Sequence, residues 1–334
     1  LYPASPLFND PAKTNDHYEH GSYDPEKWEK SAQASAGVLF SGDYSLIKPY
    51  KNIFITLSGN PEIILSKMES PSNRVEMNNG PTGFTGGMGG TAPSLNLMDK
   101  FRMDDGSPFD WNNPDHAASP FLNREERFEQ IILGNNIEWM GRNVETFEDG
   151  LDMQSVNSSK TGMYLRKFLD PIAKWFGSGQ GSTNHCFPIF RLGEIYLNYA
   201  EAMNEAYGPD ADLKGYGMTA KEALEWIYLR GGIKNDVPDG ISKTDMRKLI
   251  QDERQIELAF EEHRPYDVRR WKIADEVLNE PIQGLRITKV EEGVFEYTPY
   301  TVEERFFDPA SMHLYPIPQR EMNYNPALVQ NSGW

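Results

Sequence analysis

The strongest regular pattern in the chain is a helical spacing of apolar residues between positions 191 and 279. In its first part these residues recur three and four positions apart, at Leu192, Ile195, Tyr196, Tyr199, Ala200 and Met203. This spacing predicts a helix that ends at Gly208. A second helix is predicted after Thr219, where Glu222 completes a capping box, and it ends near Gly232. Two antiparallel helices of this kind are typical of one tetratricopeptide-like repeat.

Further helices are predicted on both sides of this pair. Asp24 and Pro25 mark a helix start, because Asp is a good N-cap and Pro is tolerated at the first helical position. Gly42 ends that helix. A long helix is predicted over about 242–263, and a shorter one follows it to about Asn279.

The remaining sequence has short apolar pieces separated by turn residues. Residues 69–94 hold many glycines with neither a helical nor a strand spacing, so we expect a long surface loop. This loop lacks the Gly-Lys-Ser/Thr of a phosphate cradle, which argues against nucleotide binding. Short elements are predicted as strands over Ile53–Leu57, Glu62–Ser66, Gln130–Leu133 and Leu165–Leu169, and as a helix near Arg124–Phe128.

These patterns predict a mostly α fold with tetratricopeptide-like helical repeats and a loop-rich, mixed C-terminal lobe. The helical elements lie near 24–41 and 191–279. The loop-rich region, 69–180, is the expected place for ligand contacts. The tail, 281–334, should be mostly extended, because its prolines oppose helix formation. We treat residues 1–334 as one unit.

Composition excludes several classes of partner. The 334 residues carry a formal net charge of −17. Binding to nucleic acid or to an anionic membrane surface would instead require a basic patch. Apolar runs are far shorter than the roughly 20 residues that span a membrane. The single cysteine, Cys186, allows no intrachain disulfide and is interpreted as a buried thiol.

One group of charged residues could be chemical or structural. Its members lie close in sequence: Glu253, Arg254, Glu257, Arg264, Asp267, Arg269 and Arg270. Each carboxylate has an arginine within one or two helical turns, so we interpret the group as a structural network whose acids stay ionised. The alternative is a glycosidase, which needs two carboxylates flanking a cleft and a proton on one of them.

Metal sites receive little support from the sequence. The six histidines are scattered, and no zinc motif is present. Aspartates near turn glycines could hold a calcium ion, although they lack the EF-hand order. They are Asp99, Asp104, Asp105, Asp110 and Asp115.

Aromatic residues in loop-like sequence suggest a binding surface. Beside Asn, Asp, Gly and Ser stand Phe84, Phe109, Trp111, Trp139, Trp175 and Phe176. A ring in such a loop either packs inward as an anchor or stays at the surface. A flat exposed ring beside amides and carboxylates suits a sugar, because the ring packs on C–H groups while polar groups bind hydroxyls. We expect at least two of these rings to be surface platforms.

Three motifs in order resemble one known family. The first runs from Arg191 to Ala202 (RLGEIYLNYAEA) and the second from Glu253 to Trp271 (ERQIELAFEEHRPYDVRRW). The third is the C-terminal series YPIP, NP and QNSGW. The chain is therefore similar to the SusD/RagB family of outer-membrane nutrient-binding lipoproteins of Bacteroidetes. It departs from the family pattern at Glu125-Glu126, where Asp-Pro is usual, and at Glu262, where Gly is usual.

This resemblance implies a function without covalent chemistry and without a cofactor. Family members capture a glycan, or less often a peptide, at the cell surface and pass it to a SusC-like TonB-dependent transporter. The resemblance also implies that this chain is the C-terminal portion, with the lipid anchor and first repeats absent from it. The rival functions are a glycoside hydrolase and a helical scaffold that binds peptides or proteins.

Our predicted ligand-binding residues combine the glycine-rich loop with two loop tryptophans. Rings and thioethers would contact sugar faces, and amides and carboxylates would bind hydroxyls. The predicted residues are Arg74, Met77, Asn78, Asn79, Phe84, Met88, Asp110, Trp111 and Trp139.

Overall fold

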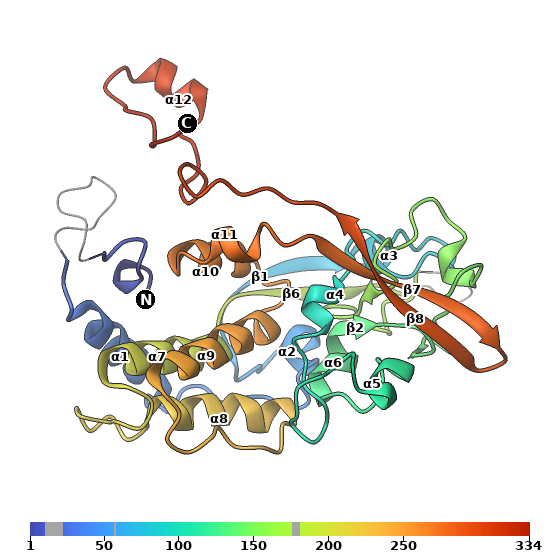
Figure 1. Ribbon diagram of the computed structural model, residues 1–334, viewed down its shortest axis with the longest axis horizontal. Helices are drawn as coiled ribbons and strands as arrows, with labels where there is room; N and C mark the ends of the chain where they lie inside the picture. Colours follow the sequence, from blue (N-terminus) through green and yellow to red (C-terminus); the bar gives the residue numbers. More distant parts are fainter. Residues whose placement is uncertain (11–22, 57, 176–180) are drawn as a thin grey trace.

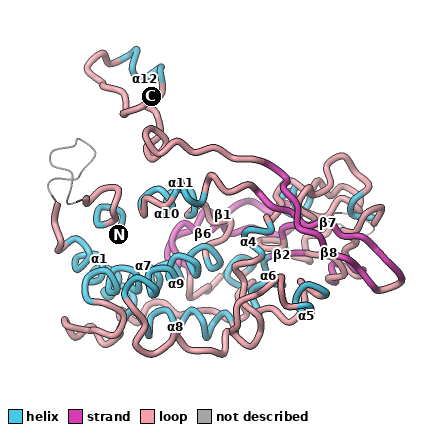
Figure 2. The backbone as a smooth tube through the Cα atoms, in the orientation of Figure 1, coloured by secondary structure: helices cyan, strands magenta, loops and turns pink. Residues whose placement is uncertain are grey.

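The computed structural model describes residues 1–10, 23–56, 58–175 and 181–334. Its main helices are α1 (Lys27–Leu39), α2 (Asn52–Ile55), α3 (Arg74–Asn79), α4 (Leu95–Met98), α5 (Pro114–Ala118), α6 (Glu126–Ile131), α7 (Leu192–Tyr207), α8 (Ala220–Gly231), α9 (Lys243–Glu257), α10 (Arg264–Arg270), α11 (Ala274–Val277) and α12 (Gln319–Tyr324). Its strands are β1 (Ile63–Ser72), β2 (Ile132–Leu133), β3 (Glu138–Trp139), β4 (Arg142–Asn143), β5 (Tyr164–Leu165), β6 (Thr183–Arg191), β7 (Ile282–Glu291) and β8 (Val294–Glu303). Long helices gather in one half of the molecule, and short helices, strands and loops fill the other (Figures 1 and 2).

The helical half has its own hydrophobic core. Helix α7 packs against α1, α8 and α9, and it buries Leu197, Ala200 and Met203. Helix α8 begins at the predicted capping box, in which Thr219 and Glu222 exchange hydrogen bonds. The helices predicted after Arg191 and after Thr219 are thus confirmed, while a tetratricopeptide-like repeat remains a prediction.

The second half is held by a core of large apolar side chains from short elements. Strands in the described residues form two-stranded antiparallel sheets, in which β1 pairs with β6 and β7 pairs with β8. Leu285 and Ile287 of β7 are buried in this core with Phe128 and Ile132. Strand β6 runs directly into α7, so it connects the two halves.

Several predicted elements differ from the structure. The segment predicted as a strand over Ile53–Leu57 is the short helix α2, which buries Ile53 and Phe54; Leu57 lies outside the described residues. The predicted loop over 69–94 contains the end of β1 and the helix α3. The helix predicted over 242–263 ends at Glu257.

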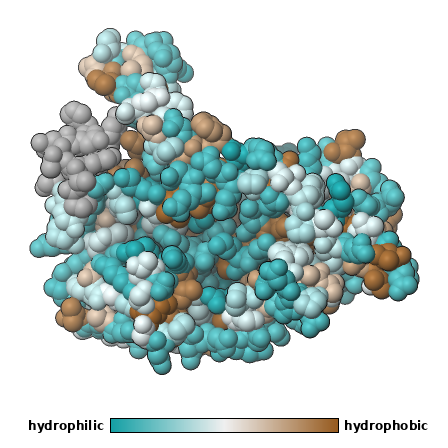
Figure 3. All heavy atoms as spheres, in the orientation of Figure 1, coloured by the Kyte–Doolittle hydropathy of each residue, from teal (hydrophilic) through white to brown (hydrophobic). Residues whose placement is uncertain are grey.

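The tail is only partly extended. Strands β7 and β8 form a long hairpin, and the chain then leaves the body of the molecule and ends with α12 (Figure 1). No residue of α12 is buried. The visible face in Figure 3 is mostly hydrophilic, with small separate hydrophobic patches. Among the described residues, none of the helices combines the length and the apolar character needed to cross a bilayer.

Candidate functional site

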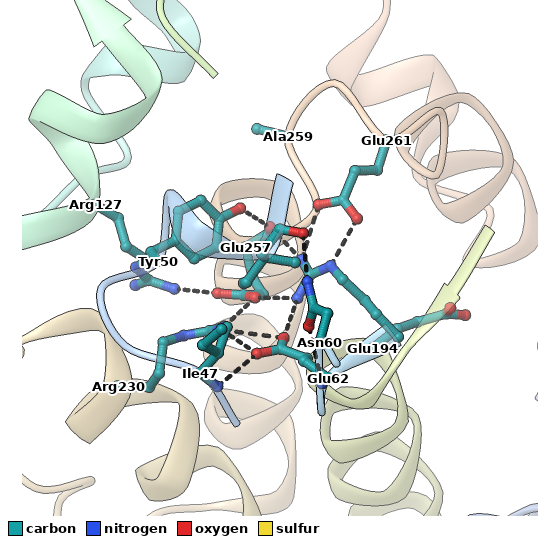
Figure 4. Close-up of polar contacts among 12 residues, drawn as sticks. Ile47, Tyr50, Asn60, Glu62, Arg127, Glu194, Arg230, Glu257, Ala259 and Glu261 are labelled. Atoms are coloured by element: carbon teal, nitrogen blue, oxygen red, sulfur yellow. Dashed lines mark hydrogen bonds and ion pairs between the residues drawn. The ribbon is translucent and has the colours of Figure 1, made fainter. Parts of the chain in front are cut away.

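A buried ion network lies where the two halves meet. Glu257 is at its centre, and the guanidinium groups of Arg127 and Arg230 point toward its carboxylate (Figure 4). Arg191 forms a third ion pair with the same carboxylate. The distances are 2.9 Å from Arg127 and 2.6 Å from Arg191. Glu62 joins the network through Arg191, at 2.9 Å, and through Arg230. These side chains come from five separate segments. The network therefore joins β6, α6, α8 and α9 to Glu62, the residue that precedes β1.

The carboxylates of the network differ in how strongly the arginines favour their ionised form. The surrounding arginines hold the pKa of Glu257 far below its usual value, against the opposing effect of burial. Glu125 and Glu253 behave differently, because both depend on the one guanidinium of Arg127. Burial raises the pKa of Glu253 and raises that of Glu125 to about 7. Burial therefore opposes ionisation of Glu253, whereas neighbouring arginines lower the pKa values of Glu257 and Asp267.

The predicted cluster is also smaller than expected at its C-terminal end. Asp267 accepts from Arg254 at 3.0 Å and from Arg270 at 2.8 Å. Arg269 donates to backbone carbonyls and lies over the rings of Phe307 and Tyr315, outside the ion pairs of the described residues. The guanidinium of Arg264 also has no ion pair among the described residues. The glutamates of the network are almost completely closed off from solvent, so they do not flank an open cleft as a glycosidase pair must.

Two of the predicted ligand-binding rings are buried, and as surface platforms these predictions are wrong. Phe84 is 5% exposed and packs against Trp175, with the Arg142 guanidinium 3.8 Å from its ring centre. Trp139 is 4% exposed and belongs to the large core of the second half. In both cases the loop contributes its ring to the core. Phe176, the remaining loop aromatic of that segment, lies outside the described residues.

Backbone hydrogen bonds within the glycine-rich loop hold the other predicted ligand-binding residues of this segment close to one another. The Met88 N–H donates to the Met77 carbonyl at 2.8 Å, and the Gly90 N–H donates to the Asn78 carbonyl at 2.6 Å. Met88 is half exposed, and Arg74 and Asn78 are exposed, whereas Met77 and Asn79 are partly buried. This surface carries no exposed ring, and its role in binding remains a prediction.

Asp110 and Trp111 lie in a second cluster, beside α5. Trp111 is partly buried, and its indole N–H donates to Asp99 at 3.1 Å. Its ring meets Phe109 edge-on with 5.0 Å between ring centres, and Phe109 stacks on His116. A cleft of about 260 Å³ opens here, and its lining includes Asp104, Asp105, Asn113, Asp115 and His116.

A larger cleft lies beside α8, and it was not predicted from the sequence. Its volume is about 610 Å³, and its lining includes Lys48, Glu126, Glu222, Glu225, Trp226, Leu229, Lys234 and Asn235. Trp226 is 51% exposed and Leu229 is 60% exposed. The buried face of α8 is formed by Ala220, Ala223, Leu224 and Ile227. Trp226 does not follow the helical spacing of these buried residues. A large aromatic residue outside the apolar face of a predicted helix is the sequence signal that could have identified Trp226 as exposed.

The two clefts meet at one turn. A Cβ atom on Gly106 would lie 2.8 Å from the Asn235 amide nitrogen, so the turn and the α8 side are in direct contact. Arg102 donates to the Tyr228 hydroxyl at 3.2 Å. Hydrogen bonds from Ser107 lower the pKa of Asp105, and the charges of His116 and Lys234 act in the same direction. We call this continuous surface, from Trp226 to Trp111, the α8–α5 face.

The proposed calcium ligands do not form a metal site. Within the described parts of the chain, no group of three or more His, Cys, Asp or Glu side chains could hold a metal ion. Asp105 instead accepts from Ser107, and Asp110 accepts from Asn112. Asp99 accepts from Trp111.

Comparison with known proteins identifies relatives of one family. A sequence model of the SusD family matches residues 61–334. Two SusD-like proteins of Formosa agariphila are 30% identical over 148 residues and 28% identical over 170 residues. These matches cover 43% and 48% of this chain but only 23% and 29% of the relatives.

Solved structures show the same fold. A SusD-like protein of Bacteroides fragilis has a TM-score of 0.76 and 28% identity, covering 92% of this chain and 62% of its own. A second structure from that organism, described as a SusD-like carbohydrate-binding protein, has a TM-score of 0.74 and 23% identity. It covers 91% of this chain and 62% of its own, so this chain spans less than two thirds of either structure. Because the family model covers most of its length, the chain belongs to the SusD family.

Proposed function

We propose that this chain binds a carbohydrate without breaking any bond, along the α8–α5 face. The observation that carries the proposal is the half-exposed indole of Trp226, which stands in an open cleft beside carboxylates and the amide of Asn235. An indole packs on the C–H face of a sugar, and carboxylates and amides accept or donate to its hydroxyls. The description of one structural relative as carbohydrate binding supports the same ligand class.

The α8–α5 face has room for more than one sugar. Its two clefts have volumes of about 610 and 260 Å³, and Asn235 in the lining of the first contacts the turn at Gly106, next to Asp105 in the lining of the second. Phe109 and Trp111 lie beside the second cleft, since Phe109 contacts both Trp111 and His116 of the cleft lining, and Asp110 is exposed. We therefore propose an oligosaccharide or polysaccharide as the ligand.

Membership of the SusD family supports a proposal about the wider role of the protein. We propose that the protein acts at the outer membrane of the cell and delivers its glycan to a SusC-like TonB-dependent transporter. No catalytic step is part of this proposal, because the buried carboxylates of the ion network have no open cleft between them. Release of reducing sugar from any glycan that the protein binds would contradict the non-catalytic role.

Affinity electrophoresis in polysaccharide gels tests the location of the site. Wild type should be retarded, and Trp226→Ala should weaken binding about tenfold, which corresponds to about 1.4 kcal/mol. Trp334→Ala is the matched control, since Trp334 is also half exposed but lies in the C-terminal tail. Unchanged retardation of both Trp226→Ala and Trp111→Ala would refute the α8–α5 face as the site.

Two alternatives are distinguished by the same gels. The first is the predicted loop surface, for which Met88→Ala rather than Trp226→Ala should reduce retardation. The second is a scaffold for peptides or proteins, which is favoured by the inward packing of Phe84, Trp139 and Trp175. It predicts no retardation by any glycan and retention on immobilised peptides.

A further inference from the structure

A third cleft, away from the α8–α5 face, contains an arginine that lacks a partner. The cleft has a volume of about 400 Å³ and opens between the end of α3, the segment after β5 and the turn that joins α9 to α10. Its lining is Asn79, Thr91, Leu165, Phe168, Leu258, Phe260, Glu262, Arg264 and Pro265. It thus combines two aromatic rings, an amide, a hydroxyl and one charge of each sign.

Arg264 differs from the other buried and half-buried arginines near it. Arg191, Arg254 and Arg270 are each held by carboxylates at 2.6–3.0 Å. Arg264 is partly buried, yet across the described ranges its guanidinium has no hydrogen bond and no ion pair. Burial lowers its pKa, and the nearby Asp267 offsets only part of that effect. The guanidinium nitrogens of Arg264 still reach solvent through the cleft, so a ligand can approach them.

The carboxylates near the cleft do not form an ion pair with Arg264 within the described residues. Asp267 is already shared between Arg254 and Arg270, so its carboxylate is not available to Arg264. Asp252 and Glu280 also act on Arg264 through their charges, with a smaller effect than Asp267. Glu262 is the acid in the lining of the cleft, and it is exposed. An anion in the cleft would give Arg264 a hydrogen-bonded ion pair, while Glu262 at the surface could accept from a hydroxyl group.

The backbone around the cleft is held in an unusual shape. Phe168, Phe260 and Glu262 have φ values of 72°, 62° and 65°, in the left-handed region that non-glycine residues rarely adopt. Each such residue costs about 1–2 kcal/mol. Two of the three bring rings to the cleft, and all three belong to its lining. Strain of this kind is concentrated at binding sites more often than elsewhere.

We infer that this cleft binds the carboxylate or sulfate group of an acidic sugar, with Arg264 as the residue that recognises the anion. A guanidinium holds such groups by two parallel hydrogen bonds. The rings of Phe168 and Phe260 supply apolar contact for the sugar. The Asn79 amide N–H donates to the Val75 carbonyl at 2.8 Å, which leaves the amide oxygen for a sugar hydroxyl. The inference extends the proposed carbohydrate binding to a second site and to acidic sugars, and it rests on that proposal only for the sugar class.

Binding of simple probes to the whole chain tests the inference. D-glucuronate, inorganic sulfate and D-glucose should be titrated by calorimetry at low ionic strength. We expect glucuronate to bind and glucose to bind at least tenfold more weakly, because glucose lacks the anion. Sulfate binding as tight as that of glucuronate would identify a general anion site, which overturns the recognition of a sugar.

Variants locate the site and separate it from the α8–α5 face. Arg264→Gln should weaken glucuronate binding at least tenfold. Arg264→Lys should retain part of the binding, because lysine keeps the positive charge but cannot form the two parallel hydrogen bonds of a guanidinium. Arg286→Gln is the control for charge alone, since Arg286 is exposed on β7. Unchanged glucuronate affinity in Arg264→Gln, with an unchanged thermal midpoint, would overturn the inference.

Trp226→Ala keeps the two proposals distinguishable. It should weaken polysaccharide retardation and leave glucuronate affinity unchanged, because the two clefts have no lining residue in common. Loss of glucuronate binding in Trp226→Ala would show that a single site accounts for both ligands, and the third cleft would then have no role. If polysaccharide retardation is absent while glucuronate binding depends on Arg264, only the proposed function of the α8–α5 face fails.

Discussion

Replacing Glu125 by glutamine should remove a loss of stability that the wild type suffers as the pH rises toward 7. Glu125 is 1% exposed, and its strongest polar contact is with Arg127 at 3.1 Å. Arg127 also forms ion pairs with Glu253 and Glu257, so its one positive charge is shared by three carboxylates. Burial consequently outweighs attraction, and the pKa of Glu125 is raised to about 7.

The sign follows from the protons bound in each state. An unfolded glutamate loses its proton near 4.5, whereas folded Glu125 keeps its proton up to about 7. Between these values the native state binds more protons, so the free energy of unfolding falls as the pH rises. The interval corresponds to about 3 kcal/mol, at about 1.4 kcal/mol per pH unit. Above about pH 7 the whole loss is present, and below about 4.5 it is absent.

Urea unfolding followed by circular dichroism at pH 5, 6, 7 and 7.5 measures this effect. The free energy of unfolding should fall with pH in wild type and fall less in Glu125→Gln. Taking the difference between the two proteins cancels other groups that titrate here, such as His185, whose pKa is raised by its hydrogen bond with Glu76. Glu126→Gln, an exposed neighbour, should behave like wild type. Parallel pH profiles for wild type and Glu125→Gln would refute the reasoning.

Three further substitutions probe the scaffold by the same unfolding measurement. Glu257→Gln should cost about 3–5 kcal/mol, because it leaves three buried guanidinium groups around a neutral amide, and a loss below 1 kcal/mol would contradict its central role. Thr219→Ala should cost about 1 kcal/mol by removing the capping box of α8, with Lys221→Ala unaffected as its comparison. Glu262→Gly should raise stability by up to about 1 kcal/mol, because it relieves the left-handed backbone, whereas Glu262→Ala should not.

The sequence predicted those elements whose pattern is local. Helices α7 and α8 follow from apolar residues at helical spacing, and the capping box marks the start of α8. Ile53 and Phe54 were misassigned because a short apolar run fits a strand and a buried helical turn equally well. The family departure at Glu262 now has a structural meaning, because its φ of 65° is one that glycine adopts without strain.

The ion network and the binding surface were harder to predict because they depend on distant parts of the chain. The sequence grouping found Glu257, but its partners Arg127, Arg191 and Arg230 lie 130, 66 and 27 positions away. Asp110 and Trp111 lie beside α5, and their predicted role in ligand binding stays a prediction. The inward packing of Phe84 and Trp139 was not predicted, since loop composition does not indicate which way a ring will turn.

The position of the α8–α5 face follows from the same long-range packing. Arg127 in α6 meets Glu253 in α9, and a Cβ on Gly231 of α8 would lie 2.7 Å from the Arg127 side chain. The network thus holds the C-terminal end of α8 against α6, and Arg102 adds a contact between Tyr228 and the turn that separates the two clefts. A ligand that spans both clefts would therefore meet groups already fixed relative to one another, and little ordering cost would accompany binding. For this reason substitutions in the network should weaken glycan binding only when they also loosen α8, whereas Trp226→Ala should weaken it with the fold intact.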